Sequence, residues 1–153
     1  MAWRTAEIIA VRDEAAHARS LVLAVDGWQG HTAGQHVDVR LTAADGYQAE
    51  RSYSISSAPQ ASRLELLVDC VPEGEVSPYL TGEARVGDRF ELRGPIGGYF
   101  AWTPEGGGPL QLIAGGTGIA PPASILAQRA TARCLPTRLL YSVRTPQDIM
   151  FKD

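Results

Sequence analysis

Two side chains that could bind a flat, charged ligand lie two positions apart in the segment RSYS, residues 51–54. In an extended strand, Arg51 and Tyr53 project from one face, and Ser52 and Ser54 project from the other. A phenol ring can stack on a flat heterocycle, while a guanidinium can form a two-pronged contact with a phosphate. The segment therefore suggests a site for a phosphate-bearing ring, although an exposed edge strand would explain the same pattern.

The segment PEGEVSPYL, residues 72–80, has features of a phosphate-binding turn. Gly74 permits backbone angles that other residues avoid. Ser77 is a good N-cap and Pro78 suits the first position of a helix, so we expect a helical turn over 77–81. The N–H groups at the start of a helix attract phosphate. A helix cap without any ligand is the alternative that these residues leave open.

A glycine loop, GGTGIAPP at residues 115–122, lies between a predicted strand and a predicted helix. Gly115, Gly116 and Gly118 would let the backbone approach a pyrophosphate, which the start of the helix would face. The loop departs from the GxGxxG pattern because Pro121 occupies the third glycine position. The strand before the loop and the helix after it favour a nucleotide-phosphate site.

The elements that would position the first two segments form one domain over residues 1–102. Six short strands with turns between them predict a closed or nearly closed antiparallel barrel. GPIGGYF (94–100) is expected to form a barrel corner, with Tyr99 and Phe100 packed beneath it. The expected strands cover residues 5–11, 19–25, 35–42, 47–56, 64–71 and 88–93.

Residues 103–109 (TPEGGGP) lack periodicity and are interpreted as a linker to a second domain at 110–153. The apolar run LQLIA, 110–114, suits a parallel strand buried on both faces. A helix over 121–131 and a strand over 137–143 complete one βαβ unit. Two parallel strands and one helix cannot cover both faces of a sheet. We therefore expect exposed apolar faces on both strands, and a region less stable than the barrel.

Composition and charge exclude several classes of protein. The 153 residues carry a net charge of −3 at pH 7, which argues against a nucleic-acid-binding surface. No apolar run approaches the roughly 20 residues of a membrane span, and residues 1–15 do not resemble a signal peptide. Cys70 and Cys134 lie far apart in the sequence. We therefore expect free buried thiols in a reducing cytoplasm, and no iron–sulfur, zinc or other metal site.

The order of the four glycine- and serine-containing motifs along the chain indicates a known protein family. RSYS, GEVS, GPIGGYF and GGTGIAP, with a barrel before the linker and a βαβ unit after it, resemble the ferredoxin–NADP reductase family. Within that family the chain is most similar to the flavin reductase components of bacterial oxygenases. The resemblance implies a six-stranded antiparallel Greek-key β barrel that binds FAD. It also implies that the first βαβ unit of an α/β domain for NADPH or NADH follows the barrel.

The resemblance implies a role for each flavin-binding segment. Arg51 would hold the flavin phosphates, and Tyr53 would stack on the isoalloxazine ring. Ser54 would lie at the ring edge that takes up hydride, so Tyr53 and Ser54 are the expected catalytic residues. The backbone and the Ser77 hydroxyl would cradle the pyrophosphate. The complete set of expected flavin contacts is Arg51, Ser52, Tyr53, Ser54, Val68, Gly74, Glu75, Val76 and Ser77.

The glycine loop would receive the second nucleotide. The resemblance implies that the nicotinamide nucleotide rests on Gly115, Gly116, Thr117 and Gly118. Ser142 and Arg144 stand where the family often contacts the adenosine ribose or its phosphate.

The implied activity is that of an FAD-dependent oxidoreductase, which passes a hydride from NAD(P)H to flavin. Electrons would then pass to an iron–sulfur or haem partner, or to oxygen. Members of the family are longer, so we expect this chain to be truncated within the nucleotide domain. Two alternatives remain: a flavin-binding module without reductase activity of its own, and a barrel that serves as a scaffold without a ligand.

Overall fold

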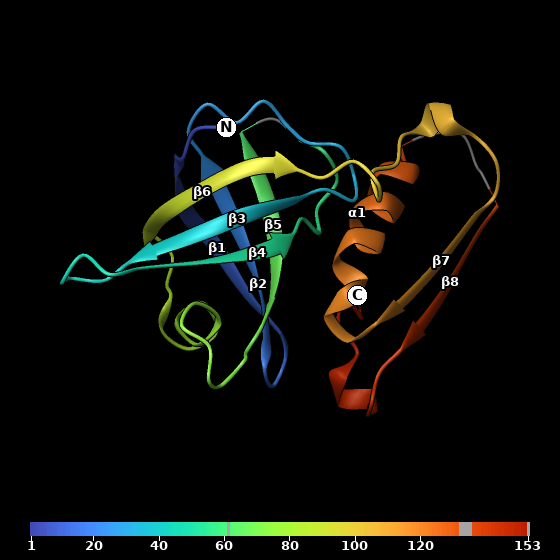
Figure 1. The fold of residues 1–153 in the computed structure, drawn as a ribbon. Helices are drawn as coiled ribbons and strands as arrows, with labels where there is room; N and C mark the ends of the chain where they lie inside the picture. Colours follow the sequence, from blue (N-terminus) through green and yellow to red (C-terminus); the bar gives the residue numbers. More distant parts are fainter. Residues whose placement is uncertain (61, 132–135, 153) are drawn as a thin grey trace.

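A computed structural model describes residues 1–60, 62–131 and 136–152. A sheet of six antiparallel strands curls into a barrel, and a two-stranded parallel sheet with one helix lies beside it (Figure 1). The strand order β4-β3-β6-β1-β2-β5 confirms the expected Greek-key barrel. The strands are β1 (Arg4–Ala15), β2 (Ala18–Val25), β3 (His36–Thr42), β4 (Gln48–Ser54), β5 (Arg63–Asp69) and β6 (Arg89–Ile96).

Alternating burial explains why these sequences form strands around one core. In β2, Leu21, Leu23 and Val25 are buried, and the residues between them are partly exposed. Val37 and Val39 in β3 show the same two-residue period. Complete burial of one such aliphatic side chain stabilises the fold by about 1.5–3 kcal/mol. The other strands complete the core with Ile8, Ala49, Leu64, Leu66, Val68, Phe90 and Leu92.

The barrel closes only in part between its two edge strands, β4 and β5. Ile55, just after β4, forms an isolated antiparallel bridge with Leu66 in β5. Ser56 donates its N–H to the Glu65 carbonyl over 2.8 Å, and Glu65 donates its N–H to Ser57 Oγ over 3.0 Å. Beyond these contacts, β4 and β5 share no strand pairing in the described residues. A seam therefore stays open alongside the rest of β4.

The helical turn expected over 77–81 is present, becomes π-helical from Tyr79 onward, and lacks the expected cap. The turn η1 spans Tyr79–Glu83 with Pro78 before it, and no side chain caps it. The Ser77 hydroxyl instead accepts the Val71 N–H over 3.0 Å. The N-cap role expected for Ser77 is therefore wrong, because its hydroxyl closes the preceding loop.

The corner at 94–100 packs through its backbone. The Phe100 carbonyl lies against Gly34, whose φ of +93° and missing Cβ permit this approach. Tyr99 is fully exposed, and Phe100 is 53% exposed. The expectation that both rings pack beneath the corner is wrong for Tyr99. The edge of the Phe100 ring does lie at Gly34 beside its own carbonyl, although about half of that ring is exposed.

Beside the barrel, a parallel strand pair and one helix form the predicted βαβ unit. Its elements are β7 (Leu110–Gly115), the 3₁₀ turn η3 (Gly116–Ile119), α1 (Ala120–Arg129) and β8 (Thr137–Ser142). The two strands are in parallel register, with Leu112 paired to Leu139. Two further 3₁₀ turns, η2 (Pro104–Gly106) and η4 (Pro146–Asp148), flank the unit.

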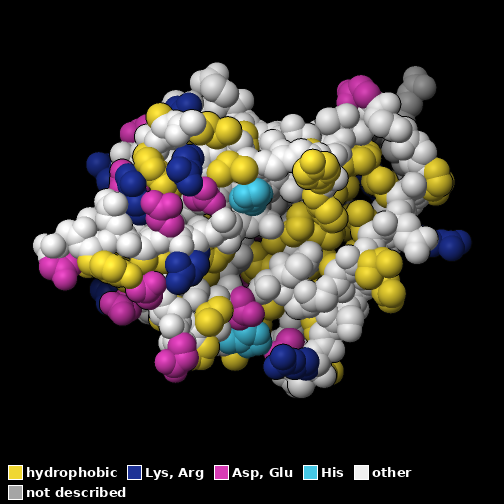
Figure 2. Space-filling model, in the orientation of Figure 1, with side chains coloured by type: hydrophobic (Ala, Val, Ile, Leu, Met, Phe, Trp, Pro, Cys, Tyr) yellow, Lys and Arg dark blue, Asp and Glu magenta, His cyan; other side chains and the backbone are white. Residues whose placement is uncertain are grey.

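Only one face of the β7–β8 sheet is covered. Leu112 and Ala114 are buried, whereas Ile113 is 66% exposed and Leu140 is 64% exposed. Figure 2 shows hydrophobic side chains gathered over the part of the molecule that holds α1, β7 and β8, while charged side chains gather over the barrel. The predicted exposure of apolar side chains is confirmed. The expected burial of 110–114 on both faces is wrong, since nothing in the described residues covers the second face.

The two halves of the chain meet at β2 and β5. Ala18 and Leu67 from the barrel pack in one buried cluster with Ala114, Ile119, Ala120 and Met150. Ser124 in α1 donates its hydroxyl to the Ser57 carbonyl over 2.6 Å. The loop that closes the seam is thus also attached to the helix of the second half.

The described residues contain neither a spanning helix nor a metal cluster. No helix in this part of the chain has the length and apolar character needed to cross a membrane. Within the same ranges, no three His, Cys, Asp or Glu side chains are grouped to hold a metal ion. Cys70 is a free thiol that is partly exposed, so it is not the buried thiol expected. Cys134 lies outside the described residues.

The one-sided burial of β7 predicts opposite outcomes for two adjacent residues. Leu112→Ala should lower the free energy of opening of β7 by about 2–4 kcal/mol, because it leaves a cavity beside Ala33 and Ile125. Ile113→Ala is the matched control and should change that free energy by less than about 0.5 kcal/mol. Hydrogen exchange of the β7 amides measures both effects. Equal losses in the two variants would contradict the one-sided burial.

Candidate functional site

A hollow of about 360 Å³ lies along the open part of the seam, between β4 and the loop that follows β5. It brings together the RSYS and GEVS segments, which are distant in the sequence. Most of the expected flavin contacts line it: Arg51, Ser52, Tyr53, Gly74, Glu75, Val76 and Ser77.

Arg51 supplies positive charge at the hollow. Its side chain is 52% exposed, and its Nη2 lies 3.2 Å from Glu75 Oε2. Its Nη1 donates to the Glu50 carbonyl over 2.6 Å. A guanidinium carries five N–H donors, so Arg51 could hold a phosphate without losing both of these contacts.

Tyr53 is positioned by the barrel core. It is paired with Val37 across the β3–β4 ladder and packs against the core cluster. Burial raises the pKa of Tyr53 to about 12, although the Arg51 charge acts in the opposite direction. The phenol is therefore neutral near pH 7, and its remaining surface can contact a flat ring.

Ser52 and Ser54 project to the other face of β4. Ser52 donates its hydroxyl to Asp38 Oδ1 over 2.7 Å, and Ser54 is paired with His36. The Ser52 hydrogen bond lowers the pKa of Asp38 against the effect of burial, and Arg93 adds to the lowering. The Ser52 hydroxyl is therefore engaged with Asp38. Ser54 is partly buried and is not among the described residues that line the hollow.

The loop after β5 is fixed by its own hydrogen bonds. Gly74 donates its N–H to the Val71 carbonyl over 2.8 Å, and the Ser77 hydroxyl accepts the Val71 N–H. A Cβ on Gly74 would lie 2.9 Å from the Val71 carbonyl oxygen, so the turn requires glycine. Val76 is fully buried and anchors the loop in the core. The loop thus presents a fixed backbone to the hollow.

Val68 is placed differently from the other expected contacts. Its side chain is fully buried in the barrel core, so it does not face the hollow. The next residue, Asp69, lines the hollow instead. The alternation of side chains along β5 accounts for this difference.

A carboxylate lies beside the arginine that is expected to bind phosphate. Glu75 Oε1 accepts the Tyr47 hydroxyl over 2.5 Å, while its Oε2 contacts Arg51. The hydrogen bond to Glu75 raises the pKa of Tyr47. A negative charge this close to Arg51 would repel a phosphate bound at the same guanidinium.

The glycine loop lies at the boundary between the two halves. Gly115 ends β7, and the other three expected residues, Gly116, Thr117 and Gly118, form part of η3. Gly116 has a φ of +51°, with open space where a Cβ would stand. Ile119, at the end of η3, packs with Leu67 in β5. The following helix α1 begins with Ala120, Pro121 and Pro122. The Ala120 N–H donates to the Thr117 carbonyl, and prolines carry no N–H, so the start of α1 offers no free backbone donors to an anion.

Sequence reasoning missed several residues at the site. Asp69, Val71 and Glu73 also line the hollow, and Tyr47 joins it through Glu75. No local pattern marks these residues, because they become neighbours of β4 only when the barrel closes. Tyr47 directly follows the Asp45-Gly46 turn, and this aromatic residue is the one sequence feature that could have drawn attention. In the structure its ring is 58% exposed.

Two models of protein domains match the chain. The oxidoreductase FAD-binding domain matches residues 7–101, which cover most of the barrel. The oxidoreductase NAD-binding domain matches residues 112–153, which include α1 and β8.

Several characterised proteins are similar over most of the chain. Methane monooxygenase component C from Methylosinus trichosporium is 36% identical over 121 residues, which cover 78% of this chain and 34% of that protein. NADH-cytochrome b5 reductase 1 from Lodderomyces elongisporus is 39% identical over 123 residues, which cover 78% of this chain and 40% of that protein. The crystal structure of a cytochrome P450 reductase from Amycolatopsis superposes with a TM-score of 0.85 at 31% identity, covering 99% of this chain and 46% of that one. The chain thus spans less than half the length of each.

The partly buried Tyr53 phenol at the hollow should have a distinctive pH dependence. A phenol pKa raised to about 12 means that Tyr53 should ionise well after an ordinary tyrosine, whose pKa is about 10. The contribution of this shift to the stability of the fold is fully present below the ordinary tyrosine pKa, and it is lost as the pH rises toward the raised pKa of Tyr53. In an ultraviolet titration, Tyr53→Phe should remove one late ionisation step. Loss of an ordinary step from Tyr53→Phe would contradict the placement.

Proposed function

The chain belongs to the ferredoxin–NADP reductase family of FAD- and NAD-binding oxidoreductases, and from that premise we propose that it is an FAD-dependent NAD(P)H oxidoreductase. The observation that carries this proposal is the hollow at the barrel seam, where the RSYS segment meets residues 74–77. An arginine, a neutral tyrosine ring and a fixed glycine turn together suit a ring that carries phosphates.

The protein's own part in this chemistry is position and charge. Bound FAD would supply the redox step, accepting two electrons with a proton as hydride from the nicotinamide and releasing electrons to an acceptor. Tyr53 would hold the flavin ring, with Ser54 near its edge, and these two would be the catalytic residues. Arg51 and the backbone of the Gly74–Ser77 segment would hold the phosphates. Ser52 and Val68 would support β4 and β5 beneath the cofactor.

The second half would receive the reduced nucleotide. NADH or NADPH would rest on the loop from Gly115 to Gly118, and the left-handed Gly116, with open space where a Cβ would stand, supports this. The division into a barrel at 1–102, a linker at 103–109 and a nucleotide domain at 110–153 is part of the same proposal. The limits of the two matching domain models support it.

The electron acceptor would be an iron–sulfur or haem protein. Two similar proteins support this, since one is a methane monooxygenase component and another is a cytochrome P450 reductase. The cytoplasmic location expected from the sequence stays a prediction.

A flavin-binding module without reductase activity is the second candidate. The uncovered face of the β7–β8 sheet, where Ile113 and Leu140 are exposed, is the observation that favours it. Addition of NADH or NADPH to the FAD-loaded chain under nitrogen separates the two candidates. Bleaching of the flavin absorbance supports the reductase, and persistent colour supports the module. Failure to bind FAD would count against both.

Removal of the Arg51 side chain should weaken the binding of flavins that carry phosphate groups, and of those only. Arg51→Ala is expected to lower FAD affinity roughly tenfold or more, because it removes charge-assisted hydrogen bonds. Riboflavin has no phosphate, so its affinity should change little. The matched control is Arg63→Ala on β5, where the arginine is exposed and donates to Gln60. Flavin fluorescence titration measures both ligands, and an equal loss for FAD and riboflavin would contradict the assignment.

Removal of the Glu75 carboxylate, which competes with phosphate for Arg51, should raise FAD affinity. Glu75→Gln retains an acceptor but removes the negative charge 3.2 Å from Arg51, so FAD affinity should rise about threefold to tenfold at low salt. The gain should shrink as salt screens the charges. Glu83→Gln in η1 is the control of equal charge. Weaker FAD binding by Glu75→Gln would show that the carboxylate prepares Arg51 for phosphate instead of opposing it.

A further inference from the structure

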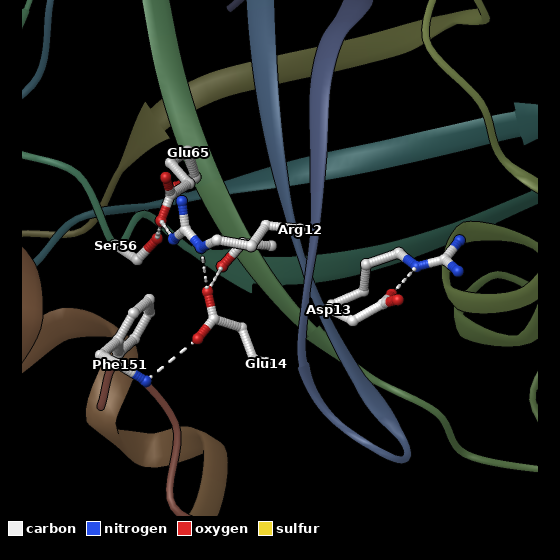
Figure 3. A network of polar contacts seen from close by, with 8 residues as sticks. Arg12, Asp13, Glu14, Ser56, Glu65 and Phe151 are labelled. Atoms are coloured by element: carbon white, nitrogen blue, oxygen red, sulfur yellow. Dashed lines mark hydrogen bonds and ion pairs between the residues drawn. The ribbon is translucent and has the colours of Figure 1, made fainter. Parts of the chain in front are cut away.

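A buried carboxylate at the boundary between the two halves takes no part in the flavin site. Glu14 lies near the end of β1, and its side chain is only 7% exposed. Its Oε1 accepts Arg12 Nε over 2.7 Å and the Ser20 hydroxyl over 2.8 Å. Its Oε2 accepts the Phe151 N–H over 3.0 Å. Figure 3 shows that the carboxylate joins a barrel strand to the C-terminal segment.

Phe151 has an unusual backbone conformation at this contact. Its φ is +55°, in the left-handed region that residues other than glycine disfavour. The Phe151 side chain packs against the buried cluster that contains residues from both halves, together with Ala15 and Tyr141. The packing of the ring and the hydrogen bond to Glu14 together sustain this conformation.

The contacts of Glu14 also lead back to the flavin strand. Arg12 Nη2 lies 3.4 Å from Glu65 Oε1, and the Ser56 hydroxyl donates to that same oxygen over 3.1 Å. Ser56 and Glu65 are the pair whose backbone bond closes the seam after β4. One polar network thus connects the C-terminal segment with the closed end of the seam (Figure 3).

The charged form of Glu14 is favoured in this setting. Burial opposes ionisation, but the Phe151 N–H, the Ser20 hydroxyl and Arg12 outweigh it and lower the pKa of Glu14. An ionised carboxylate is a stronger acceptor than a neutral group. The link to Phe151 is therefore charge-assisted near pH 7.

We propose that Glu14 is a positioning residue that fixes the nucleotide half of the chain against the flavin strand. Hydride transfer requires two rings at a defined separation, and a displacement of about 1 Å can cost about a hundredfold in rate. Glu14 acts through the backbone of Phe151 and touches neither ring. The consequence for hydride transfer rests on the proposed function, whereas the mechanical link between the halves does not.

The chain contains a matched control next to Glu14. Asp13 lies on the same hairpin and carries the same charge, but its carboxylate is 77% exposed and pairs with Arg19 of β2 at 2.9 Å. This pair joins two neighbouring barrel strands and does not involve the C-terminal segment (Figure 3). Asp13→Asn therefore removes an equivalent charge without altering the proposed link.

Hydrogen exchange on the full chain tests the link directly. Glu14→Gln should make the Phe151 amide exchange about tenfold faster or more, because a hydrogen bond to a charged acceptor is lost. Asp13→Asn should leave that amide unchanged, and neither variant should alter exchange in the barrel strands. An unchanged Phe151 amide in Glu14→Gln, or equal acceleration in Asp13→Asn, would overturn the proposal.

If Glu14→Gln also speeds hydrogen exchange in the barrel strands, a second variant tests the link. Ser20→Ala removes one donor from Glu14 Oε1 and leaves the charge in place. It should accelerate the Phe151 amide by a smaller factor, with the barrel amides unaffected. No acceleration at Phe151 would then overturn the proposal.

A kinetic readout separates positioning from a purely structural role. In the FAD-loaded chain, Glu14→Gln should lower the limiting rate of flavin reduction about tenfold, while FAD affinity and the half-saturating NADH concentration stay near those of the wild type. A parallel loss of FAD affinity would overturn the positioning role. If the wild-type chain reduces no flavin, the proposed function fails, and the exchange measurement alone decides the link.

Discussion

Incomplete closure of the barrel is the constraint on which the rest of the structure depends. The Ile55–Leu66 bridge and the Ser56–Glu65 hydrogen bond join the edge strands at one end only. Pairing of β4 and β5 along their whole length would close the space that Arg51 and Tyr53 now border. Because the strands separate, β4 can be polar and still belong to a well-packed barrel. The polar strand therefore lines a hollow at the seam, where we propose that the ligand binds.

The closed end of the seam also holds the second half of the chain. The Ser57 carbonyl accepts the Ser124 hydroxyl over 2.6 Å and lies 3.2 Å from His31 Nε2. Burial lowers the pKa of His31, although the contact with Ser57 acts in the opposite direction. The neutral ring donates from Nε2 when the proton resides there. Closure of the seam and placement of the second half of the chain thus depend on the same few residues.

The sequence predicts the elements well because their periodicity is local. Alternation defines the six barrel strands, and the glycine loop between a strand and a helix defines the βαβ unit. Local patterns do not decide which of several possible partners a polar group contacts. The hydrogen bond of the Ser77 hydroxyl within its loop and the approach of the Phe100 carbonyl to Gly34 therefore could not be predicted. Asp69 at the hollow and Glu14 at the boundary depend on segments far apart in the chain. The exposure of Ile113 depends on which elements cover each face of the β7–β8 sheet, and the apolar pattern of one strand does not specify those elements.

The central claim is that the open seam is a flavin site, and a crystal structure of the chain grown with FAD tests it most directly. In that structure the isoalloxazine ring should lie against Tyr53, and the phosphates should lie between Arg51 and the backbone of the Gly74–Ser77 segment. The Arg51–Glu75 contact should lengthen or break when the phosphates bind. FAD bound elsewhere, or a seam closed by full pairing of β4 with β5, would contradict the account.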